Sequence, residues 1–263
     1  MNRLIKLIIL IILSSSVYFI YNITKDSKIN VLTLGDGLCE GINSYGNKGY
    51  GYSDYYLIDS SKENVSLVKE CSKDMSVDKM NVLIQTDPKI KKNLKESHNL
   101  IINLGYNDLL YKMSIAEDLN IYKMNYIINN IEDNYNNLIT EIRKYYSNEI
   151  IVIGYFESNS NNQYINYGIK RLNSYLKSNK NVNYIDTYYL LHNSEKYFSN
   201  PNSYYPNSQG YIEIANKIKK KLEKDKKIWY INNAFDYYDK YFVMAEGEIV
   251  WKKIYIQKLR IVK

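Results

Sequence analysis

Residues 31–52 of this 263-residue chain read VLTLGDGLCEGINSYGNKGYGY, and this stretch decides how the rest of the sequence is interpreted. Its beginning completes an apolar segment, Ile29–Leu34, that is typical of a β-strand and that breaks into the glycine-rich turn Gly35-Asp36-Gly37. A strand that runs into such a turn and then into a helix is where α/β proteins place their chemistry. An enzyme of this architecture that used a nucleophile would be expected to carry it at position 37, where this sequence has glycine.

Length and composition indicate one globular domain with short appendages. Hydrophobic residues make up 45% of the chain and charged residues 24%, values that exclude wholesale disorder. The net charge of +7 favours anionic neighbours such as lipid head groups or acidic wall polymers. The lysines are scattered and no recognition motif is present, so we expect no nucleic-acid partner.

The N-terminus, residues 1–28, reads as a signal anchor followed by a short polar linker. Arg3 and Lys6 precede the apolar run Leu7–Tyr21, whose length lies between that of a signal-peptide core and the ~20 residues of a comfortable membrane span. Positive residues before the run should stay in the cytoplasm, so the bulk of the chain should be exported. We expect a single-pass protein of the cell membrane; the alternative is secretion after cleavage of a signal peptide.

Apolar strand-like segments alternate with amphipathic segments between residues 29 and 227. This alternation predicts a parallel five-stranded sheet with helices on both faces, a three-layer α/β/α sandwich. The expected strands are Ile29–Leu34, Asn64–Lys69, Asn99–Leu104, Glu149–Phe156 and Val182–Ile185. The expected helices are Tyr52–Ser60, Val77–Gln85, Pro88–Leu94, Asp118–Tyr146, Tyr164–Ser178 and Ser208–Lys227.

The last 36 residues, 228–263, do not fit that alternation. They hold both tryptophans, Trp229 and Trp251, and read as two aromatic strands around the turn Ala245–Glu248. We expect a C-terminal hairpin whose apolar arms are covered by the main domain or by a protein partner.

The two cysteines, Cys39 and Cys71, follow the first and second expected strands. If those strands are neighbours, the two thiols lie at the same end of the sheet. An exported protein allows them to form a disulfide, and two inert thiols are the alternative.

Three blocks in register resemble those of the SGNH/GDSL hydrolases, a family of ester hydrolases with an α/β/α fold of flavodoxin-like strand order. Gly35-Asp36-Gly37-Leu38 is similar to the family's Gly-Asp-Ser-Leu block, and Gly105-Tyr106-Asn107-Asp108 matches its Gly-x-Asn-Asp block. Residues 202–207, Asn-Ser-Tyr-Tyr-Pro-Asn, fall where the family carries Asp-x-x-His-Pro-Asn. The resemblance covers about residues 29–227.

The resemblance implies a catalytic site in which all three triad groups have been lost. The nucleophile place is Gly37, the base place is Tyr205, and the place of the aspartate that orients the base is Asn202. The oxyanion-hole and cleft residues implied by the family are Gly35, Asp36, Gly37, Gly105, Asn107 and Asp108. The family's second-block glycine has no counterpart, because residues 69–75 contain none.

Other residues offer only weak substitutes for the triad. A thiolate at Cys39 paired with His192 is one hypothesis, while His98 begins a strand at the opposite end of the sheet and reads as structural. Asp36 and Asp108 form a second candidate, a carboxylate pair for glycan hydrolysis, although such aspartates more often stabilise their own turns. No metal-ligand spacing and no phosphate loop is present, so we expect no metal and no cofactor.

The sequence therefore predicts a membrane-anchored, extracytoplasmic pseudohydrolase that keeps its cleft for a glycan, an acylated envelope ligand or a partner protein. The alternative is an active carboxylester hydrolase or deacetylase that uses unconventional residues. Tyrosines on the predicted loops would line the cleft: Tyr45, Tyr50, Tyr52, Tyr106, Tyr204 and Tyr205.

Overall fold

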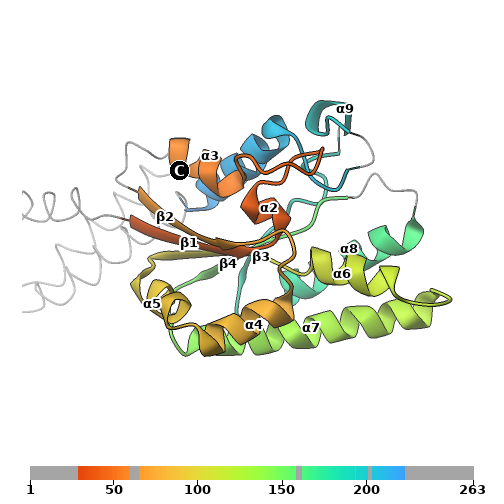
Figure 1. Ribbon diagram of the computed structural model, residues 1–263, viewed down its shortest axis with the longest axis horizontal. Helices are drawn as coiled ribbons and strands as arrows, with labels where there is room; N and C mark the ends of the chain where they lie inside the picture. Colours follow the sequence, from red (N-terminus) through yellow and green to blue (C-terminus); the bar gives the residue numbers. More distant parts are fainter. Residues whose placement is uncertain (1–28, 60–64, 158–161, 193, 201–202, 223–263) are drawn as a thin grey trace, which may run out of the picture. The chain divides into compact units, whose positions relative to one another are not determined.

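The computed structural model describes residues 29–59, 65–157, 162–192, 194–200 and 203–222 (Figure 1). Compact units of the chain are Met1–Ile218 and Lys219–Lys263. The expected anchor at 1–28, the expected hairpin at 228–263 and Asn202 lie outside the described residues. Among the residues that are described, no helix is both long enough and apolar enough to cross a membrane.

The core of the fold is a five-stranded sheet with the order β2-β1-β3-β4-β5 in which each neighbouring pair is parallel. The strands are β1 (Ile29–Gly35), β2 (Val65–Cys71), β3 (Asn99–Asn103), β4 (Ile150–Ile153) and β5 (Asn183–Ile185). This order confirms the predicted parallel sheet and its flavodoxin-like arrangement. The strand order reverses between β1 and β3, and ligand sites of open α/β sheets lie outside the carboxyl ends of the strands at such a point.

One face of the sheet is covered by five helices, which Figure 1 shows together on the side of α7. They are α4 (Val77–Thr86), α5 (Pro88–Glu96), α6 (Tyr106–Ser114), α7 (Ile121–Arg143) and α8 (Gln163–Ser178). Their apolar stripes share one core with Leu32, Leu100 and Val152 of the central strands. Side chains at the N-caps begin several of these helices, including Ser76 for α4 and Asn120 for α7.

The opposite face is covered by α3 (Tyr52–Asp59) and the helical residues 208–218, with α2 (Gly37–Glu40) and α9 (Ser194–Tyr197) near the carboxyl ends of the strands (Figure 1). Tyr52, Tyr56, Tyr211 and Ile214 are buried there. The three-layer α/β/α sandwich predicted from the alternation of segments is therefore present.

Several element boundaries differ from the prediction. The segment Gly105–Asp108, predicted as a loop, is largely the first turn of α6, because Gly105 takes the N-cap position and the apolar Leu109 and Met113 follow on one buried face. Predicted helix Asp118–Tyr146 is shorter, since Asn120 accepts hydrogen bonds from the backbone N–H groups of Tyr122 and Lys123 and so fixes the start of α7.

Candidate functional site

The site is built where β1 and β3 end side by side. Gly35 is paired with Asn103 in the sheet, and the Asp36 N–H donates to the Asn103 carbonyl over 3.1 Å. A Cβ at Gly35 would lie 2.4 Å from Cys39 Cβ and 2.9 Å from the Asn103 carbonyl oxygen. Glycine is required here because the turn passes so close to the neighbouring strand and to α2.

Asp36 is the N-cap of α2. Its carboxylate accepts a hydrogen bond of 3.0 Å from the Leu38 N–H, and only 2% of the residue is exposed. Burial, with a smaller contribution from the nearby charge of Asp108, raises the pKa of Asp36 to about 7. Asp36 therefore stabilises the turn that follows β1, and its raised pKa places its titration near neutral pH.

The place of a nucleophile at position 37 is filled by the ring of Tyr205. A Cβ built on Gly37 would lie 2.5 Å from the Tyr205 hydroxyl oxygen, 2.7 Å from Cζ and 2.8 Å from Cε1. Real Cβ atoms essentially never come closer than 3.0 Å to such neighbours. The two positions implied for nucleophile and base are thus in contact, and the end of the Tyr205 side chain would have to shift to admit a side chain at residue 37.

The backbone of Tyr205 is held by hydrogen bonds with two serines. Ser44 Oγ donates to the Tyr205 carbonyl over 2.7 Å, and Ser203 Oγ accepts from the Tyr205 N–H over 3.0 Å. Burial raises the pKa of the Tyr205 phenol, and the charge of Asp36 raises it further. A phenol that holds its proton this tightly is no general base at neutral pH.

Asn107 and Asp108 are used to hold the loop that follows β2. The Asn107 carboxamide donates to the Lys73 carbonyl, and over 3.2 Å to the Met75 carbonyl. Both carboxylate oxygens of Asp108 accept from the Val77 N–H, at 3.1 and 3.3 Å, at the beginning of α4. Burial raises the pKa of Asp108 to about 6. The donors of Asn107 point at the protein's own carbonyl groups in this structure.

A small cavity remains beside the Tyr205 ring. Its volume is about 20 Å³, roughly the room of one water molecule. The side-chain oxygen Asn103 Oδ1 is buried and has no hydrogen-bond partner among the described residues. The lining residues are Asp36, Leu38, Asn103, Tyr106, Tyr155, Phe156, Tyr204 and Tyr205.

Tyrosine rings form the outer wall of this cavity. Tyr106 stacks on Tyr155 with ring centroids 6.1 Å apart and meets the edge of Tyr204 at 5.5 Å. Of the tyrosines predicted to line the cleft, Tyr106, Tyr204 and Tyr205 do so. Tyr52 is instead fully buried at the start of α3, while Tyr45 and Tyr50 are exposed on the glycine-rich loop.

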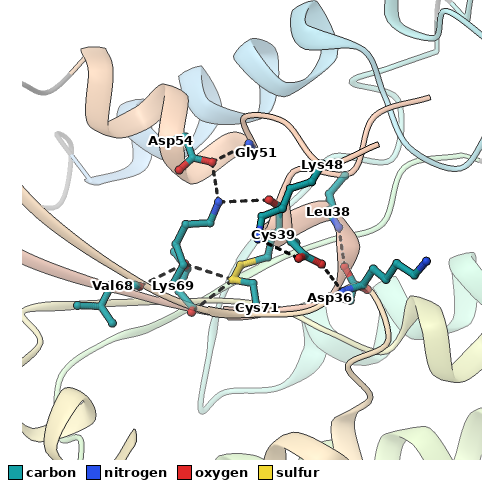
Figure 2. Close-up of a disulfide and its surroundings, with 12 residues drawn as sticks. Asp36, Leu38, Cys39, Lys48, Gly51, Asp54, Val68, Lys69 and Cys71 are labelled. Atoms are coloured by element: carbon teal, nitrogen blue, oxygen red, sulfur yellow. Dashed lines mark hydrogen bonds and ion pairs between the residues drawn. A yellow bond between two sulfur atoms is a disulfide. The ribbon is translucent and has the colours of Figure 1, made fainter. Parts of the chain in front are cut away.

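Cys39 on α2 and Cys71 at the end of β2 are joined in a disulfide with their Cα atoms 5.7 Å apart (Figure 2). The hypothesis of a Cys39 nucleophile with His192 as its base is therefore wrong. His192 is exposed, and its Nδ1 lies 3.1 Å from a carboxylate oxygen of Glu157. His98 has the predicted structural role, because its Nδ1 accepts from the Asn30 N–H near the start of β1.

Lys69 Nζ lies between α2 and α3, as Figure 2 shows. It donates to the Asp54 carboxylate over 2.6 Å and to the Glu40 carbonyl over 3.4 Å. The Asp54 carboxylate also accepts from the Gly51 N–H over 2.7 Å. These bonds brace the first glycine-rich loop against β2, as the disulfide does for α2.

The sequence reasoning missed three residues of the cavity wall that come from strand ends. Asn103 ends β3, and Tyr155 and Phe156 follow β4. The signal that could have found them is their position at the carboxyl ends of the central strands. Across the described part of the chain, His, Cys and acidic side chains form no group that could hold a metal ion.

Comparison with protein-family models and with curated proteins finds no match for this sequence. Solved structures do match. A lipase from a goat rumen metagenome aligns at 20% identity and a TM-score of 0.64, over 73% of this chain and 97% of the lipase. A catalytic mutant of an acetylxylan esterase from Geobacillus stearothermophilus aligns at 16% identity and a TM-score of 0.56, over 74% of this chain and 95% of the esterase. A putative GDSL-like lipase from Parabacteroides merdae aligns at 13% identity and a TM-score of 0.55, over 74% of this chain and 96% of the lipase. The chain therefore has the fold of the SGNH/GDSL hydrolases.

Proposed function

We propose that this protein is a pseudohydrolase, an SGNH/GDSL-fold protein that binds at its former catalytic site and does not turn a substrate over. The observation that carries the proposal is the Tyr205 ring, whose hydroxyl lies 2.5 Å from the position of a Cβ on Gly37. A missing serine alone would leave an open site, whereas here the space of the nucleophile is filled. Catalysis by an oxyanion hole without a triad gives roughly a thousandfold over water at best.

The remaining chemistry near Gly37 supports the same conclusion. Asp36 and Asp108 both accept backbone hydrogen bonds at helix beginnings, and Asn107 donates to carbonyls of the loop after β2. The sulfur of Cys39 is bonded to that of Cys71 and offers no thiolate. Each polar group that could assist an acyl transfer thus has a structural task in the described fold.

The cellular setting and the ligand class are part of the proposal. The positively flanked apolar run at 7–21 supports an anchor in the cell membrane with the fold outside the cytoplasm. A disulfide persists in that oxidising setting and is rare in the cytosol. Solved structures with this fold are described as lipases and acetylxylan esterases, and the row of tyrosine rings favours a glycan or an acylated envelope ligand. Residues 228–263 are proposed to bind a protein partner.

The test is activity-based labelling of the purified full-length chain. The unmodified protein is exposed to a fluorophosphonate probe and to simple acyl esters, beside the triple variant Gly37→Ser, Asn202→Asp, Tyr205→His. Tyr205→Ala serves as the matched control, because it empties the space above Gly37 without adding a nucleophile. We expect no labelling and no turnover by the unmodified protein or by the control.

Labelling or ester turnover by the unmodified protein would support the alternative, an active carboxylester hydrolase with unconventional residues. Labelling of the triple variant alone would show that the scaffold can still present a serine. The proposed location is checked separately, by asking whether alkaline carbonate leaves the protein in the membrane fraction and whether external protease degrades it in intact cells.

A further inference from the structure

The cavity beside Tyr205 combines features that a simple packing defect lacks. It holds about 20 Å³, and a cavity of this size accepts a group as large as a water molecule. Its rim rings, Tyr106, Tyr204 and Tyr205, are only partly buried, so the cavity lies where the fold meets solvent. The lining is mainly aromatic and apolar, and its polar residues are Asp36 and Asn103 beside the tyrosine hydroxyls, with Asp36 and Asn103 only 2% and 1% exposed.

Asp36 and Asn103 each offer a side-chain oxygen that accepts hydrogen bonds, and the carboxamide of Asn103 also carries an NH₂ donor. Asn103 Oδ1 is buried without a partner among the described residues, a state that is unfavourable in a folded protein. The Asp36 carboxylate uses one oxygen to accept from the Leu38 N–H. Two acceptors on residues that line one cavity would suit a ligand atom that can donate two hydrogen bonds.

The electrostatic surroundings favour a cation. Asp36 feels the charge of Asp108, and the charges that act on neighbouring Tyr205 are those of Asp36, Asp74 and Glu40. Of these acids, Glu40 is paired with Lys48 over 3.1 Å, and Lys112 acts on Asp108. The chain as a whole carries +7, so this acidic neighbourhood runs against its overall charge. The faces of the tyrosine rings add a further attraction for positive groups.

We propose that this cavity binds the primary ammonium group of a small ligand, with Asp36 and the carboxamide oxygen of Asn103 as its acceptors and tyrosine rings around it. The inference rests on the proposed function, because a site that does not catalyse acyl transfer is free to hold a ligand. An –NH₃⁺ group has three N–H donors and no acceptor. Two of its donors can bond to Asp36 and Asn103 while the third faces solvent. A quaternary ammonium group is larger than the cavity and has no N–H to donate.

Binding should depend on pH through the ionisation of Asp36. The titratable groups that act on it or feel its charge are Asp108 on α6, Tyr52 on α3, Tyr135 on α7, Tyr155 after β4, and Tyr205 and Tyr211. Burial raises the pKa of each of these tyrosines, so they stay neutral between pH 6 and 8. Burial also raises the pKa of Asp36 to about 7 and of Asp108 to about 6, while an alkylammonium keeps its proton across this range. Affinity should therefore rise from pH 6 to pH 8.

The experiment is calorimetric titration of the full-length chain, purified in a non-ionic detergent, with methylammonium chloride. Potassium chloride and tetramethylammonium chloride are the comparison salts, because the first has no N–H donors and the second is too large. Glucosamine and lysine amide are titrated next, to distinguish an amino sugar from a lysine-type ligand. We expect saturable binding of methylammonium alone among the three salts, stronger at pH 8 than at pH 6.

Three variants separate direct contact from general electrostatics. Asp36→Asn keeps an N-cap acceptor and removes the charge, and a charge-assisted hydrogen bond lost in this way should weaken methylammonium binding by about tenfold to a hundredfold. Asn103→Leu removes the unpartnered acceptor and should also weaken methylammonium binding. Asp74→Asn is the matched control, since it removes an acidic charge near Tyr205 from an exposed residue that does not line the cavity. It should change the affinity by less than about twofold, because exposed charges interact weakly.

Failure of methylammonium to bind the folded protein at pH 8 would overturn the proposal, as would equal binding of potassium. Equal losses in Asp36→Asn and Asp74→Asn would also overturn it, because they would show attraction to the acidic surface and not occupation of the cavity. These outcomes are independent of the fluorophosphonate test. Labelling of the unmodified protein would refute the pseudohydrolase, whereas absent amine binding with absent labelling would refute the ligand class alone.

Discussion

Gly37→Ala would place a methyl group where the Tyr205 ring already lies. The new Cβ would stand 2.5 Å from the hydroxyl oxygen and 2.7 and 2.8 Å from two ring carbons. The backbone at Gly37 is not in the left-handed region, so the substitution adds no conformational strain of its own. The consequence of the change therefore isolates one contact, that between residue 37 and residue 205.

Two opposing effects set the size of the change. Forcing extra atoms into a packed region costs about 1–3 kcal/mol of unfolding free energy. Alanine is favoured over glycine within a helix by about 1 kcal/mol, and residue 37 begins α2. With Tyr205 present we expect a net destabilisation of about 1–2 kcal/mol. In a Tyr205→Ala background the methyl group has room, and Gly37→Ala should be neutral or stabilising by up to about 1 kcal/mol.

The assay is urea unfolding of the four proteins of this double-mutant cycle, followed by circular dichroism. The coupling free energy between the two positions should be about 1–3 kcal/mol, because the helix preference of alanine cancels across the cycle. Gly49→Ala is a control glycine without a clash, since its Cβ would meet only the Gly41 carbonyl oxygen at 3.6 Å. It should change stability by less than about 0.5 kcal/mol.

A coupling free energy near zero would refute the reasoning. It would mean that the Tyr205 ring does not fill the space above Gly37 in solution, and the main support for the pseudohydrolase would be lost. Destabilisation by Gly37→Ala of the same size in both backgrounds would have the same meaning. It would assign the cost to the turn itself and not to the tyrosine.

Two further predictions concern groups around the same turn. Burial raises the pKa of Asp36 from 3.8 to about 7, so its contribution to stability is full below pH 4 and is lost as the pH rises to 7. The variant Asp36→Asn keeps the cap, and it should stabilise the protein by about 2–3 kcal/mol more at pH 8 than at pH 5. An effect of Asp36→Asn that does not depend on pH would contradict this prediction. Replacing Cys39 and Cys71 together by alanine opens a loop with a sequence separation of 32 residues and should lower the unfolding free energy by about 3–4 kcal/mol. Reductant should lower the urea midpoint of the parent protein and leave that of the double variant unchanged; equal midpoints of parent and variant without reductant would show that the bond is absent.

The fold was largely predictable because its signals are local. Buried strands such as Ile150–Ile153 read as uninterrupted apolar runs, and α7 carries a three- and four-residue stripe with an asparagine cap. The boundaries were less predictable where a glycine changes its role. Gly105, with a φ of +104°, caps the start of α6, although the same residue types also suit a loop.

The site was predictable as a set of positions but not as a set of contacts. The register of the three blocks brought Gly37 and Tyr205 to the same place, and the structure adds that the ring packs on the glycine. Asn103 could not be selected from the sequence, because an asparagine that ends an apolar strand more often bonds to its own backbone or to solvent. Its importance comes from burial and from the missing partner, which only the packed structure reveals.

Gly37 and Tyr205 constrain each other in a way that bears on how this site could change. A serine at position 37 requires the Tyr205 ring to shift from its place, and a histidine at position 205 has no nucleophile to activate while Gly37 is present. Neither single substitution restores chemistry, and the first one should also destabilise the fold. Asp36, Asn107 and Asp108 meanwhile hold helix beginnings and a loop in place. Their presence in blocks that resemble catalytic ones is therefore explained by stability alone, and catalysis is not needed to account for them.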